Sequence, residues 1–194
     1  MAGGRGRRLG GLDKGLVPWH GQPLVAHIAN RLRPQVSTLL ISANRNTEVY
    51  GRIANCPVIP DSISGYAGPL AGIARAMQVA TTRYIVTVPC DAPFLASDLV
   101  SRLYQGMTKT GAEISVARDE QRVQPMFALL QRDLLPRLLA WLQAGEHRVQ
   151  GWFEMQRTAL VALTDRADMF YNLNKPEDRT LLEKVWERLA LEDQ

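Results

Sequence analysis

The chain has 194 residues, of which 46% are hydrophobic and 22% charged, which is the composition of a soluble protein long enough for one domain over residues 1–194. Its net charge of +4 is modest, and the first fourteen residues hold a dense share of the cations, which points to a small anionic ligand, so we expect no nucleic-acid binding. Two cysteines without metal spacing, and no apolar run near the ~20 residues of a membrane span, predict a reduced, cytoplasmic protein with no membrane contact.

Hydrophobic periodicity predicts that helices and strands alternate along the chain. Apolar residues recurring every three or four positions indicate helices, and short apolar runs bounded by polar turns indicate strands. Pro23 is expected at a first helical position, and Ser97 is expected to cap a helix. The predicted helices are 23–32, 47–53, 70–79, 97–107, 133–144 and 176–191, and the predicted strands are 38–43, 58–59, 83–89, 112–117, 126–131 and 159–163.

This order of elements predicts the fold class. Strands that alternate with helices form an α/β, doubly wound, mostly parallel sheet that is covered on both faces. The run 83–89 is largely apolar, so we expect it in the centre of the sheet. In such sheets ligands bind at the carboxyl ends of the strands, and the polar residues that follow the strands are therefore candidate site residues.

The first fourteen residues, M-A-G-G-R-G-R-R-L-G-G-L-D-K, hold five glycines and four cations. Glycine leaves backbone N–H groups uncovered, so such a run can wrap an anion while Arg5, Arg7, Arg8 and Lys14 supply countercharge. The pattern indicates a phosphate-binding loop, and a disordered basic tail is the alternative. The loop is no Walker motif, because Gly15 follows Lys14, and no dinucleotide fingerprint, because the third glycine would fall on Leu9.

Asp91 follows the predicted central strand and stands in Cys90-Asp91-Ala92-Pro93. A carboxylate at the end of a buried strand has a rigid base and can hold a hard cation such as Mg²⁺. An aspartate that caps a proline-containing turn is the alternative from the local sequence.

Four ordered motifs resemble those of one family. They are A-G-G-R-G-R-R-L-G-G-L-D-K at 2–14, D-S-I-S-G-Y-A-G-P-L-A-G at 61–72, V-P-C-D-A-P at 88–93 and Y-N-L-N-K-P-E at 171–177. Together they resemble the molybdenum cofactor guanylyltransferases of the nucleotidyltransferase superfamily, which have a Rossmann-like fold. The double glycine and the Pro-Cys-Asp segment differ from the Ala-Ala-Gly and Gly-Asp-Gln that are typical of the cytidylyl-transferring relatives. Leu9 replaces the usual methionine of the first motif.

The resemblance implies roles for residues that match the family's motifs. Asp91 and Lys14 are implied as catalytic, with Asp91 as the ligand of the catalytic magnesium. Asn174 also suits an ordinary helix N-cap, so we favour Asn172 for ligand contact. The implied nucleotide-binding residues are Ala2, Gly3, Gly4, Lys14, Ser42, Asp61, Gly68, Gly72 and Asp91, and the implied molybdopterin-binding residues are Arg8, Gly11, Arg148, Asn172 and Asn174.

The activity implied by the resemblance is transfer of GMP from GTP to the phosphate of molybdopterin or molybdenum cofactor, with release of pyrophosphate and with Mg²⁺ as cofactor. Proteins that deliver the cofactor and chaperones of molybdoenzymes are the implied partners. The enzymatic alternative is a related transferase that uses CTP or a sugar-phosphate acceptor. A GTP-binding protein without catalysis and a basic nucleic-acid module are the alternatives from other classes.

One expected element is missing from the pattern. In a doubly wound sheet the phosphate loop follows the first, central strand, yet here the loop begins at residue 2. The fold should therefore lack its first central strand, and strands 38–43 and 83–89 should face each other across a vacant slot. We expect the natural product to start upstream with roughly five to ten additional residues rich in Val, Ile and Leu.

Overall fold

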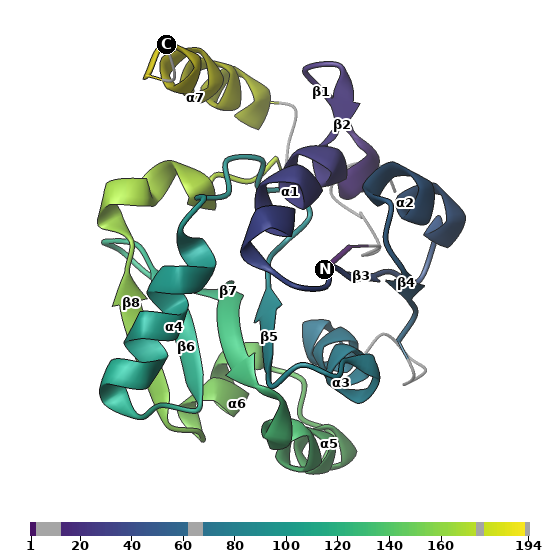
Figure 1. The fold of residues 1–194 in the computed structure, drawn as a ribbon, viewed down its shortest axis with the longest axis vertical. Coiled ribbons are helices and arrows are strands. Elements are labelled where there is room, and N and C mark those ends of the chain that lie inside the picture. Colours follow the sequence, from purple (N-terminus) through teal and green to yellow (C-terminus); the bar gives the residue numbers. More distant parts are fainter. Residues whose placement is uncertain (3–12, 62–67, 174–176, 193–194) are drawn as a thin grey trace.

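The computed structural model describes residues 1–2, 13–61, 68–173 and 177–192 (Figure 1). The predicted site residues Gly3, Gly4, Arg8, Gly11 and Asn174 lie outside this part of the chain. Its strands are β1 (Pro18–Trp19), β2 (Gln22–Pro23), β3 (Ile41–Ser42), β4 (Val58–Ile59), β5 (Tyr84–Thr87), β6 (Ile114–Arg118), β7 (Val123–Gln131) and β8 (Thr158–Ala162). Its helices are α1 (Leu24–Leu32), α2 (Thr47–Ala54), α3 (Pro69–Val79), α4 (Leu99–Thr110), α5 (Leu135–Gln143), α6 (Val149–Glu154) and α7 (Asp178–Glu192).

The α/β fold is confirmed, with a mixed sheet. The strands β5, β7, β6 and β8 form a four-stranded sheet in that order, while β3 and β4 form a parallel pair. β6 and β8 are parallel, but β7 is antiparallel to both of its neighbours. The link between β6 and β7 is too short for the crossover that a parallel pair needs, so the two strands form a hairpin.

Helices cover both faces of the four-stranded sheet, as predicted (Figure 1). Alternate residues of β7 point to opposite faces: Phe127 and Leu129 pack with α1 and α4, whereas Ala128 and Leu130 pack with α3, α5 and α6. This alternation is the period of two expected of a strand that is buried on both sides. The sheet is therefore the middle layer of three.

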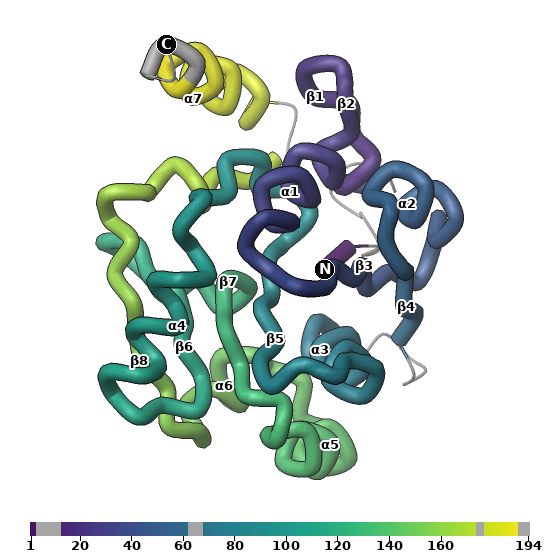
Figure 2. Tube along the Cα trace, in the orientation of Figure 1, coloured from purple at the N-terminus to yellow at the C-terminus, as the bar shows by residue number. Residues whose placement is uncertain are grey.

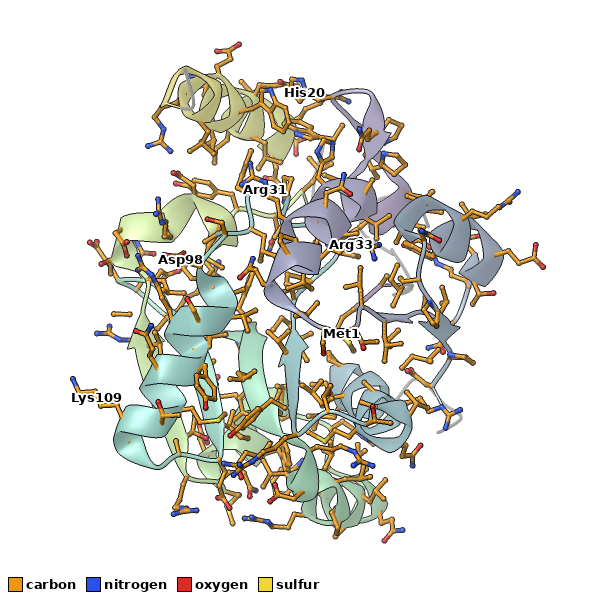
Figure 3. The ribbon with its side chains drawn as sticks, viewed as in Figure 1. Met1, His20, Arg31, Arg33, Asp98 and Lys109 are labelled. Atoms are coloured by element: carbon orange, nitrogen blue, oxygen red, sulfur yellow. The ribbon has the colours of Figure 1, made fainter. Side chains whose placement is uncertain are left out.

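The predicted slot between two strands is present. β3 and β5 face each other across a cavity of about 430 Å³, and no strand among the described residues pairs with either on that side. At one end of the cavity the Ala2 N–H donates to the Ser42 carbonyl at 2.8 Å, and the Met1 ammonium donates to the Val88 carbonyl at 3.0 Å. Figure 3 shows Met1 between these strands. Because Ser42 ends β3 and Val88 follows β5, the carboxyl ends of both strands meet there.

Several predicted boundaries need correction. Ser97 does not cap α4, because Asp98 holds the N-cap position and the helix runs on to Gly111, whose φ of 67° closes it. Pro23 belongs to the β1–β2 hairpin and stands just before α1. β3 is shorter than the predicted strand 38–43, because only Ile41 and Ser42 pair with β4.

The C-terminal helix α7 packs away from the sheet, beside the β1–β2 hairpin (Figure 2). Its residues Leu182 and Val185 pack with Trp19 and Phe94, and the Trp186 ring stacks on His20 with centroids 4.2 Å apart. Figure 3 shows His20 beside this helix. The apolar face of α7 therefore contributes to a small core cluster of its own.

Candidate functional site

Polar residues collect at the carboxyl ends of β3, β4 and β5. Ser42 is the last residue of β3, Asp61 follows β4 after Pro60, and Asp91 follows β5 on a short turn. Ser42 and Asp91 are buried, and Asp61 is half-buried. The site therefore lies where the α/β topology predicts it.

The two predicted catalytic residues are brought together. Lys14 Nζ lies 3.1 Å from Asp91 Oδ2, although 77 residues separate them in the sequence. The two side chains are 26% and 12% exposed, so the ion pair is partly shielded from water and can still be reached from the edge. A cation and a carboxylate held at the end of a phosphate-type loop suit the binding of a charged, phosphate-bearing ligand.

A second group connects β3, β4 and α3. Asn44 Nδ2 donates to Asp61 Oδ2 at 2.7 Å, and Asn44 Oδ1 accepts the Asp61 backbone N–H at 2.8 Å. A Cβ on Gly72 would lie 2.4 Å from Ser42 Oγ and 3.2 Å from Asp61 Oδ1, so only glycine lets α3 approach this closely. Three of the predicted nucleotide residues, Ser42, Asp61 and Gly72, are thus neighbours.

The two predicted acceptor residues in the described part of the chain, Arg148 and Asn172, lie in different places. Asn172 lies next to the Lys14–Asp91 pair, because the Leu173 N–H donates to the Asp91 carbonyl at 3.0 Å. Its Oδ1 is buried, with no hydrogen-bond partner in the described part of the chain. Arg148 is exposed and stands at the N-cap of α6, where the preceding carbonyl faces Gly68. The backbone at Arg148 therefore lies beside the start of α3, a predicted nucleotide-binding element.

Cys90 is next to Asp91 and carries a free, half-buried thiol. Burial, which is the largest cause, raises the pKa of Cys90 to about 12, so the thiol stays protonated at neutral pH. Burial also lowers the pKa of the Met1 ammonium, which lies close to Cys90. The arrangement favours direct transfer between bound ligands over a covalent cysteine intermediate.

Sequence reasoning missed two supporting groups. Asn44 holds Asp61 through both ends of its amide, and Asp13 accepts hydrogen bonds from Tyr50 and Asn46. The signal for Asn44 is its place directly after the predicted strand 38–43, where polar residues are candidate site residues. Asp13 carried no local signal apart from standing before Lys14.

A model of the MobA-like NTP transferase domain matches residues 1–160. The chain belongs to the MobA-like NTP transferase family. A molybdenum cofactor guanylyltransferase of Shewanella sediminis is 41% identical over 185 residues, which cover 95% of this chain and 94% of the relative. One from Yersinia pseudotuberculosis is 43% identical over 184 residues, covering 95% and 93%. The family predicted from the four motifs is confirmed.

Solved structures agree on the fold of this MobA-like transferase. Molybdopterin-guanine dinucleotide biosynthesis protein A from Archaeoglobus fulgidus has a TM-score of 0.79 and 20% identity, with 96% of each chain covered. The 2-C-methyl-D-erythritol 4-phosphate cytidylyltransferase from Thermus thermophilus has a TM-score of 0.68 and 17% identity, covering 90% of this chain and 94% of its own. The nucleotidyltransferase fold is therefore shared with proteins of different nucleotide choice.

Proposed function

We propose that this protein transfers GMP from GTP to the terminal phosphate of molybdopterin or molybdenum cofactor, forming the guanine dinucleotide and releasing pyrophosphate. The observation that carries the proposal is the Lys14–Asp91 pair, 3.1 Å apart at the carboxyl edge of the sheet, in a chain of this family. Relatives that are 41–43% identical over 95% of the chain are named molybdenum cofactor guanylyltransferases.

In the proposed reaction an oxygen of the acceptor phosphate attacks the α-phosphorus of GTP. The bond from that phosphorus to the oxygen bridging to the β-phosphorus breaks, and pyrophosphate leaves on the opposite side. The attacking phosphate is already ionised at neutral pH, so no general base is needed. Catalysis then consists of positioning and of neutralising charge, and Lys14 has both the charge and the partly exposed position to contact phosphate oxygens.

Asp91 is the residue proposed to hold Mg²⁺. Magnesium keeps several waters and is commonly bound by one or two carboxylates together with substrate phosphates. The site fits this pattern, because Asp91 offers a carboxylate at the edge, while the described residues contain no cluster of three or more His, Cys, Asp or Glu that would form a protein-only cage. When bound, the ion would neutralise charge on the phosphates.

The remaining residues are assigned to the two substrates. The nucleotide is proposed to bind to the group of Ser42, Asp61 and Gly72, together with Ala2 and Gly68. Asn172 is proposed to bind the acceptor, because it lies one residue from the backbone contact to Asp91 and has a buried Oδ1 that a ligand N–H or O–H could satisfy. The assignment of Arg148 to the acceptor stays a prediction.

Further predictions concern the location of the protein in the cell and its partners. No helix in the described ranges is long and apolar enough to cross a membrane. A cytoplasmic location, the lack of nucleic-acid binding, and partnership with proteins that deliver the cofactor or act as chaperones of molybdoenzymes stay predictions.

The proposal is tested with purified protein, Mg²⁺ and molybdopterin, by measuring pyrophosphate release with GTP, CTP or ATP. We expect release with GTP that depends on molybdopterin, and much slower release with the other two nucleotides. Faster release with CTP would favour the cytidylyl alternative. Binding of GTP without release of pyrophosphate would favour a protein that has lost catalysis.

A further inference from the structure

We infer that Asp13 and Tyr50 are positioning residues for Lys14, fixing the backbone on both sides of this lysine so that its ammonium is held at the reaction centre. The inference rests on the proposed function. Lysine has four rotatable side-chain bonds, so it holds a defined geometry only when its backbone is fixed and its tip has a partner. The tip has such a partner in Asp91, 3.1 Å away.

The Asp13 carboxylate is buried and is held from one element, the start of α2. The Tyr50 hydroxyl donates to Asp13 Oδ1, and Asn46 Nδ2 donates to Oδ2 at 3.0 Å. Arg45 Nε lies 3.3 Å from the same oxygen, and the Asp13 side chain is only 6% exposed. A buried carboxylate is tolerated where it is paired and hydrogen-bonded in this way, and the contacts fix its backbone.

Because Asn46 contacts Asp13, helix α2 lacks a side-chain cap at its N-terminus. Asn46 stands at the N-cap of α2 with a left-handed φ of 52°, yet its side chain makes no capping hydrogen bond and donates to Asp13 instead. An Asn at that position would ordinarily satisfy the first N–H groups of its own helix. The Asn46 side chain therefore stabilises Asp13, the residue before Lys14, instead of its own helix.

Tyr50 also fixes the residue on the other side of Lys14. The Tyr50 side chain is fully buried, and a Cβ on Gly15 would lie 2.6 Å from its hydroxyl oxygen and 3.0 Å from Cε1. The backbone of Gly15 thus packs directly on the ring, while the carboxylate of Asp13 accepts from the same hydroxyl. One side chain of α2 therefore contacts both neighbours of Lys14.

Burial raises the pKa of Tyr50, with further contributions from Cys90 and from the hydrogen bond to Asp13, so its hydroxyl keeps its proton and donates throughout the neutral range. The contact is a fixed structural support, and Tyr50 itself is not placed on the substrate.

The test is a double-mutant cycle with Lys14. Asp13→Asn keeps the size of the side chain, and Tyr50→Phe keeps the ring on Gly15 while removing only the hydroxyl. Each variant is made alone and in combination with Lys14→Ala. Four quantities are measured for every variant: kcat/KM for GTP, KM for molybdopterin, the affinity for GTP and the temperature of thermal unfolding. We expect each single change to lower kcat/KM for GTP by about 10-fold, within the range of coupling between residues in contact, and to leave KM for molybdopterin within about twofold.

In the Lys14→Ala background the same changes should cause no further loss beyond about twofold, because the group they position is gone. A merely structural role would lower the rate again by about 10-fold, and that result would overturn the inference. Glu113→Gln is the matched control: it also turns a largely buried, hydrogen-bonded carboxylate into an amide, but at the amino end of β6. It should leave kcat/KM unchanged, and an equal loss there would also count against a specific role.

The cycle separates this inference from the proposed function. If the parent protein releases no pyrophosphate, the proposed reaction fails, and the same cycle is then measured in GTP affinity. Coupling of Asp13 and Tyr50 to Lys14 in GTP affinity would uphold the positioning role, whereas additive losses would overturn it.

Discussion

Different forces stabilise two regions of the molecule. One region is the edge of the sheet at the carboxyl ends of β3 and β5, and the other is the interior of the four-stranded sheet. At the edge, the chain is joined by polar contacts between distant residues, among them Lys14 with Asp91 and Asn44 with Asp61. In the sheet, β7 is packed on both faces by buried apolar side chains, with Phe127 on one face and Leu130 on the other. The comparison teaches that the polar contacts of the proposed site and the apolar packing of the sheet lie in separate parts of one fold, so each should be open to change alone.

The largest expected effect is on stability, in the sheet. Leu130→Ala removes a fully buried side chain of β7 and should cost about 2–5 kcal/mol of unfolding free energy, because a cavity is added to the lost transfer energy. Urea unfolding measures the loss, with Leu130→Met as a control that should cost under about 1.5 kcal/mol. The rate of GMP transfer per folded molecule should hardly change, and a large fall in that rate would show that the two regions are coupled.

The second effect is the reverse, a loss of activity at the edge with little change in stability. Asp91→Asn should lower the transfer rate by on the order of 10²-fold or more, in line with removal of a principal electrostatic group. The fold should persist, because the residue lies on a turn at the end of β5. Single-turnover kinetics and thermal unfolding measure the two quantities. A variant that transfers GMP near the parent rate would leave Asp91 as only a turn residue.

The third prediction separates the residues proposed to bind GTP from the residue proposed to bind molybdopterin. Lys14→Ala should weaken GTP binding by about 10-fold, because it removes a charge-assisted contact to phosphate. Arg148→Ala should weaken molybdopterin by a similar factor and leave GTP affinity nearly unchanged. Calorimetric titration of each variant with both ligands decides this. Arg148 stands at the N-cap of α6, and the carbonyl of the preceding residue faces Gly68 just before α3, so an equal loss of both ligands would assign Arg148 to the nucleotide side.

The smallest effect concerns the ion pair between Glu113, whose side chain is 12% exposed, and the exposed Arg137. The hydrogen bond from Arg137, the largest cause, lowers the pKa of Glu113 below its ordinary 4.5. A lowered folded pKa means that the stabilisation is present above the unfolded pKa and is lost as pH falls through the folded value. Glu113→Gln should therefore be less stable by about 1 kcal/mol at neutral pH, and the difference should shrink as pH falls below 4.5 and be lost once pH passes the lower pKa of the folded protein. A difference that is independent of pH would contradict this origin.

Much of the fold could be predicted, because local pattern determines it. The Leu-rich run 133–144 contains α5, and the apolar run 83–89 contains β5. The direction of β7 was not predicted, since hydrophobic alternation is the same for parallel and antiparallel strands and only the short β6–β7 link distinguishes them. The short helix α6 and the two-residue strands β1 and β2 were missed, because such elements carry too few residues to show a period.

Part of the candidate site could likewise be predicted from the sequence, and part could not. Lys14 and Asp91 were identified by resemblance, and the structure adds that they are in contact. Asp13 and Tyr50 could not have been paired from the sequence, because they are 37 residues apart and each looks ordinary in its own segment. Their relation depends on the packing of α2 against the loop before α1, which is a tertiary fact.

The central claim is tested most directly by following the α-phosphorus of GTP. The protein, with Mg²⁺ and molybdopterin, is given GTP labelled either at the α- or at the γ-phosphorus, and the products are separated. The account predicts that the α-label enters the dinucleotide formed with molybdopterin and that the γ-label leaves in pyrophosphate. A γ-label released as inorganic phosphate, or an α-label that never joins the acceptor, would contradict it.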